Sequence, residues 1–256
     1  MSILDYITDN TEIVIANKFG YNVANIPGEK KIYHKKFNIN DMIVGELAKL
    51  RKLNVNQYFF LLLDSLCGKF KYSDISKMKK INESGIKIGS YNFCCDDVQY
   101  FECPADTNFF DIISWCPNEK NQQELINEIL ELFALDIYTW EEDRFTYNII
   151  FEKRSNGEIH LSKIFDFGDS LNSQLFPNGF AYYNSLYDFE TKEDYSKFMG
   201  IYPQFQEYLK FYQNVDLIKE MERIFEEKKL NIKKFPIDQY KKFEEKSQKV
   251  LHKILN

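Results

Sequence analysis

Apolar residues recur at helical spacing through most of the second half of this 256-residue chain. Between Asn118 and Tyr138 they return every three to four positions, as at Leu125, Ile129 and Leu132, and further apolar residues occupy the other side. This pattern predicts a helix that is largely buried. Similar spacing predicts four more helices, at 191–199, 203–213, 215–229 and 236–255. We therefore expect a mainly helical C-terminal part.

The N-terminal part has short β-prone runs with turn residues between them. Strands are predicted at 11–16 and 31–37, and the polar loop between them carries Gly20 and Gly28. The run at 58–63 fits either a helix or a strand, since short apolar runs are ambiguous. Beyond it the pattern predicts a helix at 73–82, strands at 85–95 and 97–103, and a break at 104–108. We take the break as a boundary between two lobes, at 1–103 and 104–256.

One helix is expected between these strands. Asn40 is its predicted N-cap and Asp41 complements the helix dipole, while apolar residues recur along one face at Ile43, Leu47, Leu50 and Leu53. Glu46 lies at the margin of that face. The helical pattern by itself favours a surface ion pair of Glu46 with Lys49, or with Arg51 and Lys52.

Two β-prone runs, at 147–154 and 158–165, flank Asn156 and Gly157. Asn-Gly is the strongest short-range hairpin signal, because a type I′ turn needs a positive φ at both central residues. A two-residue turn of this type sets Ser155 opposite Glu158 and fixes the register of the whole hairpin.

The predicted register brings polar residues together at the open end of the hairpin. Asn148 is expected opposite Phe165, and therefore beside Asp166, while Asp143 lies in the loop that enters the first strand. Oxygen ligands that converge in this way suit a hard cation such as Mg²⁺. An ordinary surface hairpin with polar ends is the alternative.

Composition excludes several classes of protein. Hydrophobic residues make up 44% of the chain and charged residues 28%, which is typical of a globular protein. The net charge of -6 predicts no broad basic surface, so direct nucleic-acid binding is not expected. No apolar run approaches the length of a membrane span and the first residues lack a secretory signal, so we expect a cytoplasmic protein without a membrane partner.

The five cysteines show no C-x-x-C spacing, and the three histidines are widely scattered. Reduced, mostly buried thiols are therefore expected, although a zinc site built from Cys94, Cys95, Cys103 and a histidine is an alternative.

Two short motifs carry the candidate chemistry. Asp143 and Asn148 form D-x-x-x-x-N, and Asp166 begins D-F-G. In this order the two motifs resemble the active site of protein-kinase-type phosphotransfer enzymes. The resemblance implies that Asp143 accepts the proton of the attacking hydroxyl, and that Asn148 and Asp166 bind Mg²⁺.

A longer stretch, 125–171, resembles the C-lobe of HipA-type serine/threonine kinases. That family is similar to phosphoinositide kinases in using D-R-H-x-x-N for its catalytic loop and D-x-G-x-S for its metal loop. The matching residues here are Asp143, Arg144, Asn148, Asp166, Gly168 and Ser170. The resemblance implies an α+β bilobal kinase fold, with a small mixed N-lobe of antiparallel strands and one helix, and a larger, mainly helical C-lobe that carries the catalytic hairpin.

The same resemblance, applied by order along the chain, assigns the ATP contacts. Lys35 or Lys36 would hold the phosphates and pair with Glu46, and the loop with Gly28 would cover the nucleotide. Strand alternation does not decide between the two lysines; we favour Lys35, which shares a face with Tyr33. The glycine spacing does not match G-x-G-x-x-G, so a plain hairpin loop is the alternative.

Three departures from the family surround the catalytic loop. Phe145 replaces the family histidine, Tyr147 stands where a small residue is usual, and Glu141 and Glu142 replace Gly-Asn. These substitutions put the substrate type and the rate in question, while the catalytic triplet is intact.

The resemblance implies an ATP- and Mg²⁺-dependent kinase that phosphorylates Ser or Thr of a protein. Many family members are the toxins of bacterial toxin–antitoxin pairs, so an antitoxin protein is an expected partner, and a few members are secreted effectors. Two other classes stay open: a small-molecule phosphotransferase of the aminoglycoside or choline type, and a pseudokinase or nucleotide-binding interaction module.

Overall fold

The computed structural model describes residues 38–63, 86–91, 98–104, 107–172, 181–183 and 186–256, together with residue 11 and short strands at 13–16, 18–19, 23–25 and 32–35. Gly28 and Lys36 lie outside the described residues, as does the helix predicted at 73–82. Lys35 is described only as part of a strand.

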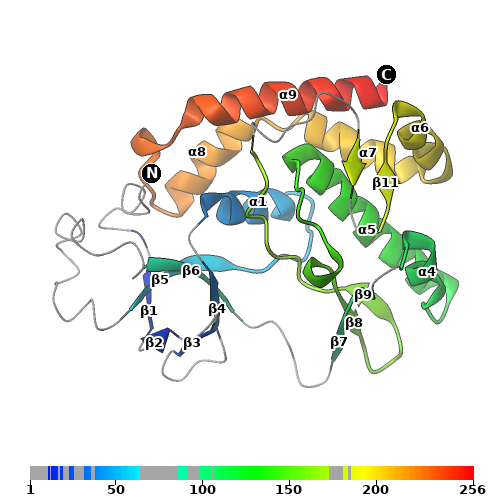
Figure 1. Cartoon of the computed structure of the whole chain (residues 1–256), viewed down its shortest axis with the longest axis horizontal. Helices are drawn as coiled ribbons and strands as arrows, with labels where there is room; N and C mark the ends of the chain where they lie inside the picture. The colour runs from blue at the N-terminus through cyan, green and yellow to red at the C-terminus, as the bar shows by residue number, and fades with distance from the viewer. Residues whose placement is uncertain are drawn as a thin grey trace.

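The N-terminal part is built on a six-stranded sheet in the order β1-β5-β6-β4-β3-β2 (Figure 1). Its strands are β1 (Ile13–Ala16), β2 (Lys18–Phe19), β3 (Val23–Asn25), β4 (Ile32–Lys35), β5 (Tyr58–Leu63) and β6 (Ile86–Tyr91). β1 pairs with β5 in parallel, and the other neighbours are antiparallel. The ambiguous run at 58–63 is thus a strand, and the antiparallel strands predicted for this part are confirmed.

Helix α1 (Ile39–Lys49) packs against this sheet and against α8 (Leu217–Glu227). Ile43, Val44 and Leu47 are fully buried, as the apolar spacing predicted. The helix begins earlier than predicted: Asn38 is the N-cap and its side chain accepts from the Asn40 N–H at 3.1 Å. The prediction of Asn40 as the cap was wrong because two asparagines compete for the same position, and the side chain of Asn40 bonds elsewhere.

The C-terminal part is mainly helical, as predicted. Its helices are α4 (Phe109–Ser114), α5 (Glu119–Thr139), α6 (Lys192–Ile201), α7 (Pro203–Gln213), α8 and α9 (Ile237–Leu255). Figure 1 shows α9 lying along α7 and α8, with α5 between these helices and the smaller sheet. Aromatic rings fill the interior near α6, where Phe189, Phe198 and Phe205 are all fully buried.

The smaller sheet holds the hairpin that was predicted from Asn156 and Gly157. It pairs β7 (Gln99–Glu102), β8 (Ile150–Lys153) and β9 (Ile159–Leu161) in antiparallel order, and a two-stranded sheet joins β10 (Tyr182–Tyr183) to β11 (Asp188–Phe189). β7 lies before the predicted lobe boundary but bonds to β8 after it. A boundary at 103/104 remains a prediction.

The turn of the hairpin is longer than predicted by one residue. Phe151 lies opposite Leu161, so the connection from 155 to 157 has three residues. Gly157 takes a positive φ of 86°, whereas Asn156 does not and instead accepts the Glu158 N–H at 3.0 Å with its side chain. This conformation fits a type I turn followed by one left-handed residue. The predicted register was therefore wrong by one residue, because a type I′ turn requires positive φ at Asn156 as well.

Among the described residues, no helix combines the length and hydropathy of a membrane-crossing segment.

Cys103 and Cys116 are buried free thiols, and burial raises the pKa of each to about 11. Both thiols are therefore protonated near neutral pH.

Candidate active site

The candidate catalytic loop, 141–148, begins where α5 ends. Trp140 caps the helix with a left-handed φ of 52°, and this turns the chain sharply out of the helix axis. Its indole is buried against Tyr182, and its Nε1–H donates to Glu142 at 2.8 Å. The chain therefore enters the loop from a fixed point.

A buried ion pair fixes the middle of the loop. The Arg144 guanidinium donates from Nε and Nη2 to the two carboxylate oxygens of Asp136, at 2.9 and 3.1 Å, and both side chains are fully buried. Burial acts to lower the pKa of Arg144 and the Asp136 charge outweighs it, so the pKa lies above its ordinary range. The guanidinium also lies over the Phe167 ring, 5.1 Å from its centroid. Helix, loop and D-F-G segment thus meet at one cation.

Arg144 also joins the two motifs directly. Its Nη1 donates to the backbone carbonyl of Phe165 at 2.8 Å and contacts that of Asn148 at 3.4 Å. Asn148 therefore lies beside the residue that precedes Asp166. The predicted hairpin register set Asn148 opposite Phe165. In the structure the Arg144 guanidinium joins the backbone carbonyls of these two residues.

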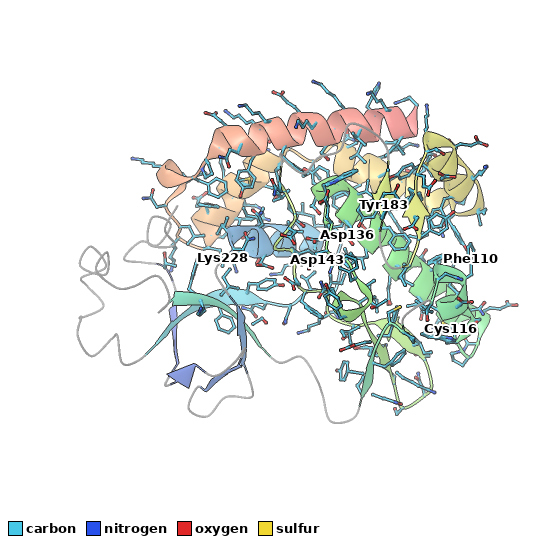
Figure 2. All side chains as sticks on the ribbon, viewed as in Figure 1. Phe110, Cys116, Asp136, Asp143, Tyr183 and Lys228 are labelled. Atoms are coloured by element: carbon cyan, nitrogen blue, oxygen red, sulfur yellow. The ribbon has the colours of Figure 1, made fainter. Side chains whose placement is uncertain are left out.

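Asp143 and Asn148 are tied to each other. The Asn148 amide donates to the Asp143 backbone carbonyl at 2.7 Å and approaches its Oδ2 at 3.4 Å. A single 3₁₀ turn, η4 (Thr146–Asn148), makes this approach possible. Figure 2 labels Asp143 and Asp136 near the middle of the view, and Arg144, which directly follows Asp143, connects the loop to Asp136.

The D-F-G backbone is held by side chains from the N-terminal part. The Asp166 N–H donates to the Tyr58 hydroxyl and the Phe167 N–H donates to Asp41 Oδ1, both at 2.9 Å. Asp166 has a positive φ of 61°, a conformation that the two bonds help to hold. Burial raises the pKa of Tyr58 well above its ordinary value, so the phenol remains neutral.

The start of α1 makes two further bonds to the same segment. The Asn38 amide donates to the Gly168 carbonyl, and the Asn40 amide donates to the Ser170 carbonyl at 2.6 Å. The Tyr240 hydroxyl of α9 in turn donates to Asn40 at 2.7 Å. Asn40, predicted as a cap, therefore links three elements.

The buried Glu141 side chain connects the loop that carries Asp143 to the segment that follows D-F-G. Its carboxylate accepts the Asp143 N–H at 3.0 Å and the Ser170 hydroxyl at 2.5 Å, and it is fully buried. Burial raises the pKa of Glu141 to about 7, opposed by the nearby charge of Arg144. Ser170, which matches the family D-x-G-x-S pattern, is thus a structural link to the catalytic loop.

Among the described side chains, Glu46 pairs with two lysines that the family resemblance did not imply. Lys35 is described only as part of a strand and Lys36 lies outside the described residues, so a pairing of either with Glu46 remains a prediction. The Glu46 carboxylate lies 2.7 Å from Lys49 Nζ and 3.1 Å from Lys228 Nζ. Burial acts to raise the pKa of Glu46, but the two ammonium groups outweigh it and lower the pKa. Lys49 is three residues away from Glu46 on α1, and Lys228 directly follows α8, which packs against α1. This is the surface pairing that the helix pattern favoured.

The site offers few protein ligands for a cation. In the part of the chain that the structure describes, three or more His, Cys, Asp or Glu side chains nowhere gather as a metal cluster. The chemistry of Mg²⁺ fits such a site, because this ion uses one or two carboxylates and completes its shell with phosphates and water. The Asp166 carboxylate and the Asn148 side-chain oxygen are the candidates.

Two solved structures share this architecture. The Helicobacter pylori proinflammatory kinase CtkA superposes with a TM-score of 0.54 at 14% identity, over 96% of this chain and 97% of that one. The chain has a kinase-like fold. HipA from Shewanella oneidensis MR-1, solved with HipB and its operator DNA, gives a TM-score of 0.56 at 10% identity, over 91% of this chain but only 62% of that one.

Because these sequence identities are low, the two comparisons show the fold alone. No protein-family model matches the chain, and no curated protein matches it in sequence. The expected HipA-like fold is thus supported in its general form.

Sequence reasoning missed the groups that support the site. Asp41 was interpreted only as a helix-dipole residue, and Tyr58 only as part of an apolar run. Glu141 was noted as a departure from the family without a role. The one signal available was Asp136, a carboxylate on the apolar side of a buried helix, which requires a cationic partner in the core.

Proposed function

We propose that this chain is an ATP- and Mg²⁺-dependent kinase that phosphorylates a Ser or Thr of a protein substrate. The observation that carries the proposal is the buried Arg144, which holds the D-x-x-x-x-N loop against the D-F-G segment within a kinase-like fold. Phosphoryl transfer needs little covalent chemistry from a protein, so catalysis rests on positioning and on electrostatic stabilisation.

Each residue then has one task. Asp143 orients the acceptor hydroxyl and takes its proton as the new oxygen–phosphorus bond forms and the bond between the γ-phosphorus and the departing ADP breaks. Asn148 and Asp166 would hold Mg²⁺, and Lys35 or Lys36 would contact the phosphates. When bound, Mg-ATP supplies the phosphoryl group and the metal neutralises its charge.

The test is incubation of the purified protein and host lysate with [γ-³²P]ATP and Mg²⁺. We expect label in protein bands with the wild type, and a loss of at least a hundredfold with Asp143→Ala or Asp166→Ala. Asp188→Ala, which removes an exposed carboxylate on β11, is the matched control and should keep wild-type labelling. Circular dichroism and melting curves check that the variants fold. Wild-type labelling by both Asp143→Ala and Asp166→Ala would refute the proposal.

A nucleotide-binding module without transfer is the second candidate. The ion pairs of Glu46 with Lys49 and Lys228 motivate it, because these two ammonium groups compete with a phosphate-binding lysine for that carboxylate. A rise in Tm with Mg-ATP, together with no labelling of any protein, would select this alternative.

A partner protein of the antitoxin type is also proposed, since the HipA neighbour was solved with HipB and operator DNA. Expression of the chain alone should then arrest growth of the host, and a neighbouring gene product should relieve the arrest. The expectations of a cytoplasmic location and of no direct nucleic-acid contact remain predictions.

A further inference from the structure

Two aromatic side chains stand exposed beside the catalytic aspartate. Phe145 is 50% exposed and Tyr147 is 53% exposed, and their ring centroids lie 5.8 Å apart. Both belong to the loop that Arg144 anchors from the interior, so the rings are presented by a fixed backbone. Large apolar side chains exposed together next to a reaction centre are typical of a binding surface.

The Tyr147 hydroxyl contacts the carboxylate that an acceptor hydroxyl would also need. It donates to Asp143 Oδ1 at 3.2 Å. An acceptor hydroxyl must donate a hydrogen bond to this same carboxylate before it gives up its proton. The place of the acceptor is therefore held by a residue of the protein itself.

We propose that Phe145 and Tyr147 are the acceptor-recognition surface, and that they select a polypeptide with an aromatic side chain next to the hydroxyl residue. The Tyr147 hydroxyl leaves Asp143 when the acceptor binds, and its ring then packs with Phe145 against the acceptor's aromatic side chain. This inference rests on the proposed kinase function and specifies its substrate.

An aromatic partner fits better than a cationic one. The rings offer apolar faces on which another ring stacks edge-to-face or offset. Three nearby carboxylates have other roles: Glu142 accepts from Trp140, Asp143 serves the hydroxyl, and Asp166 is the candidate metal ligand. Asp169 is exposed and also acts on Tyr147, so the arginine peptide tests whether its charge favours a cation instead.

The experiment compares three synthetic peptides that share one sequence around a single serine and differ only in the following residue: phenylalanine, alanine or arginine. Phosphorylation by [γ-³²P]ATP and Mg²⁺ gives kcat/KM for each. The readout is the ratio of the phenylalanine to the alanine peptide, which is insensitive to a general loss of activity. We expect a ratio of about three to ten for the wild type, the range that aromatic pairs reach.

The variants distinguish the contribution of the aromatic rings from that of the Tyr147 hydroxyl. Phe145→Ala and Tyr147→Ala should bring the ratio to about one, whereas Tyr147→Phe should keep it and lower the peptide KM about threefold, because no phenol competes for Asp143. Phe110→Ala is the matched control: Phe110 is 49% exposed on α4, and Figure 2 shows it well apart from Asp143. It should keep the wild-type ratio. Melting curves confirm that all variants fold.

Labelling of the peptides with a wild-type ratio near one, or a higher rate for the arginine peptide, would overturn this inference and leave the kinase proposal in place. An unchanged peptide KM in Tyr147→Phe would overturn the competition by the phenol. If the wild type labels neither peptides nor lysate proteins, the kinase proposal fails and the inference with it.

Discussion

Replacing Asp136 with asparagine tests whether its ion pair with Arg144 holds the catalytic loop. Both side chains are fully buried, and the carboxylate accepts two bonds from the guanidinium, at 2.9 and 3.1 Å. Asparagine keeps the size of the side chain and removes the charge, so the guanidinium is left in the interior without its counter-ion. Breaking a buried pair in this way costs about 3–5 kcal/mol. For a chain of this size, that lowers the Tm by on the order of 10 °C.

Urea unfolding followed by tryptophan fluorescence measures the loss, since Trp140 is buried directly after α5. The control is Glu193→Gln, which breaks an exposed ion pair with Lys197 and should change the free energy of unfolding by less than about 0.5 kcal/mol. Phosphotransfer by Asp136→Asn should fall even at temperatures where the variant is folded, because Arg144 orients the loop.

The double variant Asp136→Leu with Arg144→Met separates stability from positioning. It removes both charges, so we expect the free energy of unfolding to return toward the wild-type value. Activity should not return, because the Phe165 carbonyl beside Asp166 has lost its donor. A loss below about 1 kcal/mol in Asp136→Asn, or a double variant as unstable as the single one, would refute the reasoning.

Three further changes probe other features. Burial raises the pKa of Glu141 to about 7 from an ordinary value of 4.5, so the native state binds this proton more tightly than the unfolded chain. Wild-type stability should therefore fall by up to about 3 kcal/mol between pH 4.5 and 7, and Glu141→Gln should lack this part; equal pH slopes in urea titrations would contradict it. Gly157→Ala meets no atom within 4 Å but forces alanine into a φ of 86°, so it should cost about 1 kcal/mol, and an unchanged urea midpoint would show that the turn relaxes. Arg51→Lys should lose the two-pronged bond to Glu131 and the contact with the aromatic rings of α7, lowering the free energy of unfolding by roughly 1 kcal/mol; a wild-type urea midpoint would count against these contacts.

Local patterns predicted the elements whose causes are local. Helix α7 runs from Pro203 to Gln213 as predicted, because proline is favoured in the first turn and the apolar face is regular. The hairpin was predicted from Asn156 and Gly157, but the predicted register was wrong by one residue. The same dipeptide allows two turn types, and the side-chain bond of Asn156 decides between them.

The supporting groups of the site depend on contacts between distant parts of the chain. Asp41 bonds to Phe167 across 126 residues and Tyr58 bonds to Asp166 across 108. Neither follows from spacing along the sequence, because each arises only when α1 and β5 pack against the C-terminal part. The motif residues themselves were recognisable from their order along the chain, whereas the groups that support them were not.

The bonds from Tyr58 and Asp41 to the D-F-G backbone have a dynamic consequence. Phe165 and Ser170, on either side of this segment, are bonded to the C-terminal part, so the segment fastens the two halves that Figure 1 shows. Solvent deuterium can replace the amide hydrogens of Asp166 and Phe167 only when these bonds open. Their exchange rate therefore reports how often the halves separate, which is the step that nucleotide entry and release would require.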